Sequence, residues 1–419
     1  MRVSTSGFGL LLGSVTLGLL APGPLSAGPR PLFPRACVTR AALGARAGSA
    51  VSYGAVSRTP VGLPREAAAA PAKVYVATEL ESAITVVDAV TNQTIRKIVL
   101  GYDIVGTPYE MVFYPRGVVV APDGASVWVA APIPMADCPG EEGGMSEGGP
   151  NLPPGATEEI IVLDPQADTI LARIQVPSLV VGTYLHLSGV VIDRDSRYAY
   201  VTANGSSQII RVDAQTYQVV GRVDLGANRD PQGIETCDDK ILVANGAGRS
   251  LSVVEVARGT VEEVPLNGVA IRAVCSSDSR FAYVTLYDTR EIARYEFATG
   301  GITRMPLPKE AIGPSQLAFS RDGRRLYVLD QGTLMNRPAG NKMYELDPQT
   351  GAVRAAITVG HAPRGLVLSE DGKTAYTSNY YDANISVVDL VTRRVVATVA
   401  TGIAPNGIGV WQNSERLVQ

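Results

Sequence analysis

The sequence of 419 residues is short of the side chains from which metal and redox centres are usually built. It has two histidines, and its four cysteines form no Cys-x-x-Cys pair, so neither a zinc site nor a dithiol motif is indicated. It shows no nucleophile elbow, phosphate-binding loop or metalloprotease helix. We therefore predict no metal and no cofactor, and any active site must be assembled from scattered residues.

Charged residues are also scarce, at 18%, and their signs are unevenly distributed. The first 65 residues carry seven arginines and no lysine, aspartate or glutamate. The rest of the chain therefore has 37 − 7 = 30 basic and 40 acidic residues, a net charge of −10. An acidic body repels phosphate backbones, so we expect no nucleic-acid partner.

The apolar run near the start, Gly7–Leu20, is too short to span a bilayer comfortably, and we expect no membrane span. It follows Arg2 and precedes Leu25-Ser26-Ala27, the pattern of a secretory signal peptide. We predict a signal at 1–27 and a secreted or periplasmic protein, with a transit peptide or a miscalled start codon as alternatives. Residues 28–72, rich in Ala, Pro, Arg and Gly, predict a disordered linker.

From Lys73 onward the chain repeats a unit of about 42 residues. Each acid that ends its apolar strand opens a turn, as in Asp347-Pro-Gln-Thr-Gly, where a short carboxylate can accept hydrogen bonds from the turn's own N–H groups. We predict that these acids are structural. The seven strands are Ile84–Asp88, Ile160–Asp164, Ile209–Asp213, Leu251–Glu255, Ile292–Glu296, Met343–Asp347 and Ile385–Asp389.

Two further strands precede each apolar strand. The nearer one, such as Tyr75–Thr78 or Tyr200–Ala203, opens with an aromatic residue in most units, which we expect to pack between sheets. The earlier one ends in a hairpin turn, as at Ser320–Gly323. With the strand after the acidic turn, each unit has four antiparallel strands, which is typical of a β-propeller blade.

The two ends of the repeat region predict how the ring closes. The first unit lacks an inner strand, whereas Pro405–Trp411 has an inner-strand pattern and no blade after it. We therefore predict an all-β fold, a seven-bladed β-propeller at 73–411 with four antiparallel strands per blade. Its C-terminal strand completes the first blade, which removes open sheet edges. A tail follows at 412–419.

Three stretches, Tyr200–Asn204, Ile385–Asp389 and Pro363–Gly372, resemble the repeats of YVTN-type seven-bladed propellers of exported bacterial proteins. The resemblance covers about residues 73–411 and implies a fold more than an activity. Similar propellers include uncharacterised periplasmic proteins, lactonase-like enzymes and proteins associated with quinone-dependent dehydrogenases.

All large departures from the repeat length fall on one face, which we call the top face. It carries the loops that lead into the inner strands and the loops between second and third strands. The long segments lie at 101–114, 131–157, 177–187 and 331–342. Because loops on a rigid scaffold often carry function, we expect a ligand or partner here. The acidic segment 131–157 is interpreted as a solvated lid, with a Ca²⁺ loop as the alternative.

Five of the seven inner strands have glycine at their third position, which predicts a close approach of neighbouring backbones around the axis. Three arginines beside this ring suit a carboxylate or another anion, unless they pair with acids such as Glu110 and Asp230. The candidate ligand-binding residues are Arg116, Gln232, Arg272, Gln316, Arg364 and Asn406.

Candidate catalytic residues are the acids and histidines expected at the top of the channel: His186, His361, Glu110, Asp330 and Glu79. The histidines fall in blades 3 and 7, nearly across the ring, which is too wide for one metal ion without other ligands. Cys237 and Cys275 occupy similar points of consecutive repeats, so a disulfide is one interpretation. The favoured one is two small buried apolar residues.

The leading hypothesis is a monomeric exported scaffold, without catalytic activity, that binds a protein partner or a small anionic ligand through its top face. The first alternative is a lactonase- or lyase-like enzyme with its site at the top mouth of the channel. The second is an accessory protein of a periplasmic dehydrogenase system.

Overall fold

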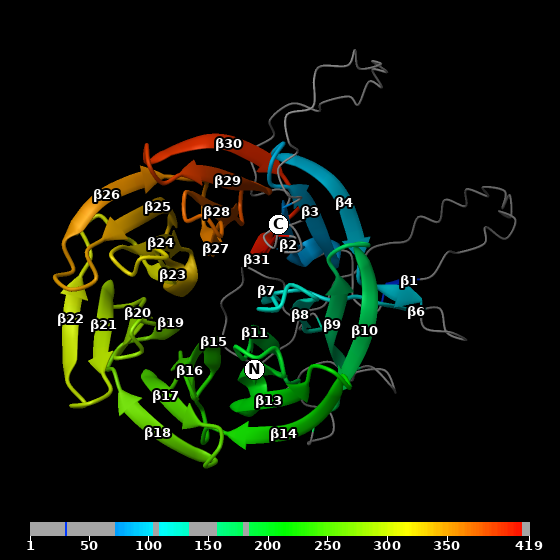
Figure 1. Ribbon diagram of the computed structural model, residues 1–419, viewed down its shortest axis with the longest axis horizontal. Coiled ribbons are helices and arrows are strands. Elements are labelled where there is room, and N and C mark those ends of the chain that lie inside the picture. Colours follow the sequence, from blue (N-terminus) through cyan, green and yellow to red (C-terminus); the bar gives the residue numbers. More distant parts are fainter. Residues whose placement is uncertain (1–29, 32–71, 104–108, 134–156, 179–183, 413–419) are drawn as a thin grey trace, which may run out of the picture.

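The computed structural model describes residues 30–31, 72–103, 109–133, 157–178 and 184–412. Figure 1 shows seven four-stranded sheets arranged around one axis, each with its first strand innermost. The predicted fold class, an all-β seven-bladed propeller, is confirmed. The predicted signal peptide, nearly all of the predicted linker and the residues after Gln412 lie outside the described ranges.

The blades follow one another along the chain, and each is an antiparallel sheet that runs from an inner to an outer strand. Blade 1 is β31 (Pro405–Gln412), β2 (Ala72–Thr78), β3 (Ala83–Asp88) and β4 (Gln93–Val99). Blade 2 is β7 (Val118–Val120), β8 (Val127–Ala131), β9 (Glu158–Asp164) and β10 (Thr169–Val176). Blade 3 is β11 (Leu187–Ile192), β12 (Tyr198–Ala203), β13 (Gln208–Asp213) and β14 (Gln218–Asp224). Blade 4 is β15 (Pro231–Cys237), β16 (Lys240–Asn245), β17 (Ser250–Glu255) and β18 (Thr260–Pro265).

The last three blades have the same order. Blade 5 is β19 (Ala270–Cys275), β20 (Phe281–Leu286), β21 (Glu291–Glu296) and β22 (Ile302–Pro306). Blade 6 is β23 (Pro314–Phe319), β24 (Leu326–Gly332), β25 (Ala339–Leu346) and β26 (Val353–Thr358). Blade 7 is β27 (Pro363–Leu368), β28 (Thr374–Asn379), β29 (Asn384–Asp389) and β30 (Arg394–Ala400).

The C-terminal strand closes the ring, as predicted. β31 pairs antiparallel with β2, so that Val410 lies opposite Val74 and Ile408 opposite Val76. The indole Nε1 of Trp411 donates to the carbonyl of Gly124 in blade 2, at 2.8 Å. Strands from the two ends of the repeat region therefore complete one sheet, and no inner edge is left open.

A small three-stranded sheet was not predicted. β1 (Arg30–Pro31) pairs in parallel with β6 (Tyr109–Met111), and β6 pairs antiparallel with β5 (Tyr102–Asp103). Arg30 and Pro31 fall in the segment predicted as a disordered linker. A pairing between segments so far apart in sequence leaves no local pattern from which it could be read.

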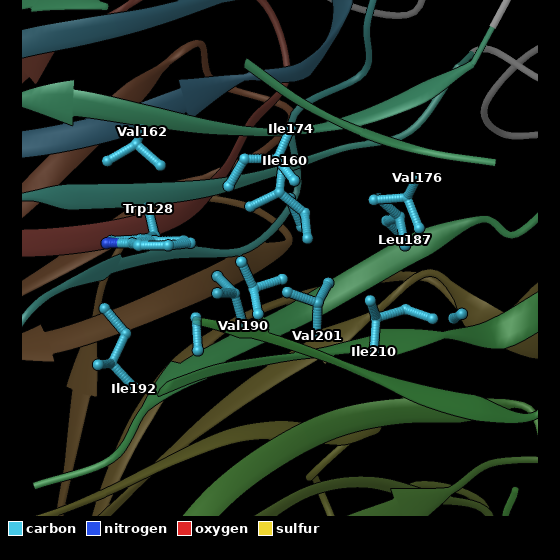
Figure 2. Packing of buried hydrophobic residues seen from close by; sticks show 14 of the residues in the cluster. Trp128, Ile160, Val162, Ile174, Val176, Leu187, Val190, Ile192, Val201 and Ile210 are labelled. Carbon is cyan, nitrogen blue, oxygen red and sulfur yellow. The ribbon is translucent and has the colours of Figure 1, made fainter. Parts of the chain in front are cut away.

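The hydrophobic core is divided among the blade-to-blade interfaces. Figure 2 shows one of them, where Trp128 and Ile160 of blade 2 meet Val190 and Val201 of blade 3. The predicted packing role of the second-strand aromatic residues is confirmed, because each is at most 4% exposed. They are Tyr75, Trp128, Tyr200, Tyr283, Tyr327 and Tyr376.

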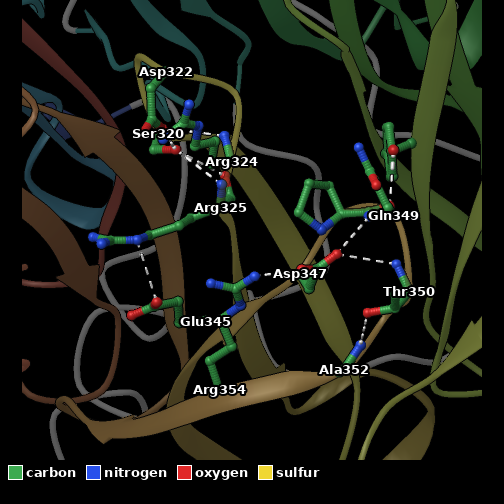
Figure 3. Close-up of polar contacts among 12 residues, drawn as sticks. Ser320, Asp322, Arg324, Arg325, Glu345, Asp347, Gln349, Thr350, Ala352 and Arg354 are labelled. Atoms are coloured by element: carbon green, nitrogen blue, oxygen red, sulfur yellow. Dashed lines mark hydrogen bonds and ion pairs between the residues drawn. The ribbon is translucent and has the colours of Figure 1, made fainter.

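The five aspartates that end third strands hold their turns as predicted, whereas Glu255 and Glu296 accept from the side chains of Arg258 and Thr299 in theirs. In Figure 3 the Oδ1 atom of Asp347 accepts hydrogen bonds from the backbone N–H of Gln349, at 2.9 Å, and of Thr350, at 3.1 Å. Asp88, Asp164, Asp213 and Asp389 accept the same pair of bonds in their own turns. These carboxylates lie on the face opposite the top face.

The ring of glycines around the axis is required by backbone contact between blades. A Cβ atom on Gly233 would lie 2.6 Å from the carbonyl oxygen of Ile271, and one on Gly407 would overlap the carbonyl oxygen of Arg116. Hydroxyl groups bridge the same junctions: Thr202 Oγ1 accepts from Gly189 N–H at 2.8 Å and lies 3.3 Å from the carbonyl of Gln232. The predicted close approach is confirmed.

The favoured interpretation of Cys237 and Cys275 was wrong, because the two residues form a disulfide. They end the inner strands β15 and β19, whose backbones run side by side in blades 4 and 5. Their Cα atoms are 5.4 Å apart, within the range that a disulfide spans. Only the docking of the two blades sets this distance.

The insertion at 331–342 extends blade 6 as a hairpin. β24 runs on to Gly332 and β25 begins at Ala339, with the short helix η3 (Leu334–Asn336) between them. Arg337 fixes this hairpin by donating to the carbonyls of Tyr287, Asp288 and Ile312. No helix in the described ranges is long and apolar enough to cross a membrane.

Candidate functional site

Residues from three blades converge at the top end of the axis on one buried carboxylate. Glu79, in the short helix η1 (Glu79–Glu81) after β2, has a side chain only 1% exposed. Its Oε1 lies 3.3 Å from Arg116 Nε, its Oε2 lies 3.6 Å from Arg364 Nη1, and Oε2 accepts a hydrogen bond from Asn406 Nδ2 at 3.1 Å. Together with Tyr380 we call these residues the arginine cluster.

The way the inner strands begin explains this convergence. Arg364 and Asn406 are the second residues of β27 and β31, and Arg116 stands just before β7. The pairing of β27 with β28, and of β31 with β2, shifts register near this end. Such bulges redirect side chains locally, which lets polar residues gather where strict alternation would separate them.

The arginine cluster has an excess of positive charge. Two guanidinium groups and one carboxylate leave a net charge of +1. Among the described residues, Arg364 Nε is buried and donates no hydrogen bond, whereas Arg116 Nε lies 3.3 Å from Glu79 Oε1 in an ion pair without hydrogen-bond geometry. A buried donor without an acceptor costs roughly 1–3 kcal/mol, so an acceptor supplied by a ligand would be stabilised here.

Tyr380 supports the cluster from blade 7. Its ring lies 3.6 Å from the guanidinium carbon of Arg364, a cation–π contact. Its hydroxyl is buried and forms no hydrogen bond with any described residue. Burial, and secondly the charge of Glu79, raises the pKa of Tyr380, so the hydroxyl stays protonated and can donate to a ligand.

A second group of polar residues, the acidic network, lies on blades 2, 3 and 4. Glu158 accepts from the backbone N–H groups of His186 and Leu187, each at 2.8 Å. Asn204 N–H donates to the carbonyl of His186 at 3.2 Å, and Asn204 Nδ2 donates to Asp230 Oδ1 at 3.2 Å. Gln232 Nε2 donates to both oxygens of Asp230, at 2.9 and 2.8 Å.

Burial has the largest effect on the pKa values of the titratable groups in this network. It raises the pKa of Glu158 to about 7, although the backbone donors and the charge of Arg116 act in the opposite direction. Burial also raises the pKa of Asp230. Most of His186 is enclosed, and this burial, together with Arg116, lowers the pKa of its imidazole well below the usual range. His186 is therefore neutral near pH 7.

Glu158 should make the protein less stable as the pH rises from about 4.5 to 7. Its folded pKa, about 7, exceeds its ordinary value of 4.5, so in this interval the folded state holds a proton that the unfolded state releases. At about 1.4 kcal/mol per pH unit, stability falls by roughly 3 kcal/mol across the interval and levels off above it. Denaturant unfolding at several pH values measures this fall.

The variant Glu158→Gln isolates the contribution of this residue, because glutamine does not titrate. Its unfolding free energy should vary less with pH than that of the wild type by about the same roughly 3 kcal/mol. Parallel pH profiles for the two proteins would contradict the prediction. The comparison removes the effects of other acids, which titrate in both proteins.

The other predicted site residues do not join the arginine cluster. Arg272 Nη2 lies 3.6 Å from Glu235 Oε2 on the neighbouring inner strand, and Gln316 occupies the glycine position of β23. Asp330 is 2% exposed and accepts from the backbone N–H of Ile312 and Gly313, which fixes the loop into β23. Its carboxylate therefore serves to hold this loop in place.

His361 forms an exposed pair on blade 7. Its Nδ1 lies 3.1 Å from Asp382 Oδ1, and its backbone N–H donates to Asp382 Oδ2 at 2.7 Å. Glu110 lies in β6, but its side chain, like the acidic segment 134–156, is outside the described part of the structure. Among the described residues, no three His, Cys, Asp or Glu side chains are placed to share a metal ion.

Several residues of the site were missed from the sequence. Glu158 opens an apolar strand, so a buried acid was visible there, but nothing showed that it would face the loop into blade 3. Tyr380 follows the second-strand motif of blade 7 and carried no separate signal. The acids expected to pair with the arginines were Glu110 and Asp230. In the structure, Arg116 and Arg364 pair with Glu79 instead.

The fold and site define a seven-bladed β-propeller with a polar centre at one end of its axis. The family model described as "Lactonase, 7-bladed beta-propeller" matches residues 281–415, about a third of the chain. The chain is thus similar to this family from the second strand of blade 5 to the closing strand. Among curated proteins no match was found.

Solved structures share the fold at low sequence identity. Periplasmic gluconolactonase from Pseudomonas aeruginosa is 16% identical with a TM-score of 0.58, covering 81% of this chain and 99% of that one. Hydrazine synthase from Kuenenia stuttgartiensis is 18% identical with a TM-score of 0.56, covering 76% and 92%. Virginiamycin B lyase from Staphylococcus aureus is 16% identical with a TM-score of 0.53, covering 70% and 87%. At such identities the likeness extends to the fold alone.

Proposed function

We propose that the protein binds a small ligand with a carboxylate group at the top end of the propeller axis, through Arg116 and Arg364. The observation that carries the proposal is the convergence of two guanidinium groups on one buried carboxylate, with a net charge of +1 and an Nε donor of Arg364 that no described residue uses. A ligand carboxylate would balance the charge and accept hydrogen bonds from the guanidinium groups. We favour a small ligand over a protein partner because these charges converge on one point.

A panel of small carboxylic acids, each with its neutral amide as a matched control, tests this proposal. The acids should raise the unfolding temperature and bind in calorimetry, and the amides should not. Arg116→Gln and Arg364→Gln should each weaken binding by at least about tenfold. Arg354→Gln is the control variant, since Arg354 pairs with Asp347 on the opposite face. Equal binding of acids and amides would contradict the proposal.

Lactone hydrolysis is a second candidate function. The match to the lactonase family model favours it, as does a neutral His186 beside a carboxyl whose pKa is about 7, a suitable range for acid–base chemistry. A lactone-hydrolysis screen combined with metal analysis of the purified protein addresses it. Turnover that is lost in Glu158→Gln would support it, and the absence of both metal and turnover would count against it.

We also infer that the protein is a monomeric, exported propeller of the YVTN type. The signal-like segment 1–27, the YVTN-like repeats and a disulfide, which persists in oxidising compartments, support this. Expression of the full chain, followed by cell fractionation and mass determination of the mature N-terminus, tests export. Light scattering of the purified protein tests whether it is a monomer in solution.

A further inference from the structure

The acidic network has too little positive charge around it. Glu158 is 4% exposed and Asp230 is partly buried, and the hydrogen bonds that they accept come from neutral amides. In the described part of the chain, the cation whose charge acts on both carboxyls is Arg116, which is already paired with Glu79. His186 supplies no charge because its imidazole is neutral.

The network also contains acceptors that nothing in the structure uses. Asn204 is 6% exposed, and its buried Oδ1 accepts no hydrogen bond from the part of the chain that the structure describes, while its Nδ2 is held by Asp230. The hydroxyl of Tyr184 is likewise buried and has no hydrogen-bond partner among the described residues, and the charge of Glu158 acts on it. The amide oxygen of Asn204 and the two carboxyl groups are acceptors, and the Tyr184 hydroxyl can accept as well as donate, so a ligand with N–H donors suits these atoms.

An ammonium group has the properties that this site lacks. It carries one positive charge and three N–H donors, and it has no acceptor that would conflict with these oxygens. A metal ion fits less well, since no three metal-ligating side chains converge among the described residues. Arg116 links the two sites, because it pairs with Glu79 and also acts on Glu158 and Asp230.

We propose that the ligand is an amine-bearing carboxylate, an amino acid or a related zwitterion. Its carboxylate lies on Arg116 and Arg364, and its ammonium group lies on Asp230, Glu158 and the Oδ1 atom of Asn204. The assignment of the carboxylate rests on the proposed function above. The assignment of the ammonium group stands on the acidic network and the unused acceptors.

Matched probes that differ in one charged group test the proposal on the full-length protein. One set is phenylalanine, hydrocinnamate, which lacks the amine, and phenethylamine, which lacks the carboxylate. A second set, with a longer spacing between the groups, is ε-aminocaproate, hexanoate and hexylamine. In at least one set the zwitterion should bind at least about tenfold more tightly than either partial analogue, as measured by calorimetry.

The variants Asp230→Asn and Asn204→Ala locate the ammonium group. Each variant should bind the zwitterion about tenfold more weakly than the wild type does. Its affinity for the acid without an amine should stay within about twofold of the wild-type value, because that acid contacts only the arginines. Thermal unfolding confirms that each variant is folded. The comparison of probes on the wild-type protein needs no variant, so it decides the question even if a variant fails to fold.

Two results overturn the proposal and are distinguishable from each other. If the acids without an amine bind as tightly as the zwitterions and still depend on Arg116 and Arg364, the ammonium site is wrong and the carboxylate site stands. If no acid depends on the arginines, the carboxylate site is wrong and the zwitterion is excluded with it. Amine binding that is lost in Asp230→Asn would then support the ammonium site alone.

Discussion

Replacing Gly407 by alanine should destabilise the propeller by about 3 kcal/mol or more, although it adds one methyl group. The new Cβ would overlap the carbonyl oxygen of Arg116 and lie 2.9 Å from the backbone N of Val118. A backbone clash cannot be relieved by rotating a side chain. Strand β31 must move away from blade 2, and the same strand closes the ring through its pairing with β2.

Gly409→Ala is the matched control on the same strand. A Cβ there would lie 3.4 Å from the side-chain methyl groups of Val118 and Val120, close to ordinary contact. We expect its unfolding free energy to stay within about 1 kcal/mol of the wild type, because alanine also restricts the unfolded chain. Denaturant titrations of the three proteins measure the difference. Equal stability of the two variants would show that the backbone contact at Gly407 does not control closure.

Removing the disulfide should lower stability by about 2–4 kcal/mol. Cys237 and Cys275 are 38 residues apart, so the bond closes a long loop and restricts the unfolded chain. It also ties the inner strands of blades 4 and 5 together. The double variant Cys237→Ala/Cys275→Ala should therefore unfold at a lower denaturant concentration than the oxidised wild type.

A reducing agent provides the control for this prediction. It should destabilise the wild-type protein to about the level of the double variant and have little effect on the variant itself. The variant keeps Cys37 and Cys138, so it also reports any contribution from these two cysteines. A wild type that unfolds identically with and without reductant would contradict the prediction.

The sequence alone did not decide whether Cys237 and Cys275 form a disulfide. Their similar positions in consecutive repeats were visible, and a bond was one of two interpretations. The distance between them depends on how closely two inner strands approach, which the glycine contacts around the axis set. A free buried cysteine and a bonded one look alike in a sequence, because both occupy apolar strand positions.

The arginine cluster was also only partly predictable. Arg116, Arg364 and Asn406 were selected because each stands beside a glycine of the ring, and the repeat places all inner-strand starts at one end of the axis. Arg272 was selected because it occupies a ring position itself, and it pairs with Glu235 instead. The difference follows from position, since Arg272 is the third residue of its strand and Arg364 the second, and successive side chains of a strand point to opposite faces.

The sequence by itself determined the fold: seven blades, four strands in each, the acidic turns and the closing strand. Each of these follows from local patterns of period two and from a repeat near 42 residues, and repeated local patterns survive in a single sequence. Only the tertiary structure decided that Glu79 receives two arginines, that Cys237 meets Cys275, and that Asn204 and Asp230 share a network. These contacts join residues from different blades, and the ring, not the spacing along the chain, sets their distances.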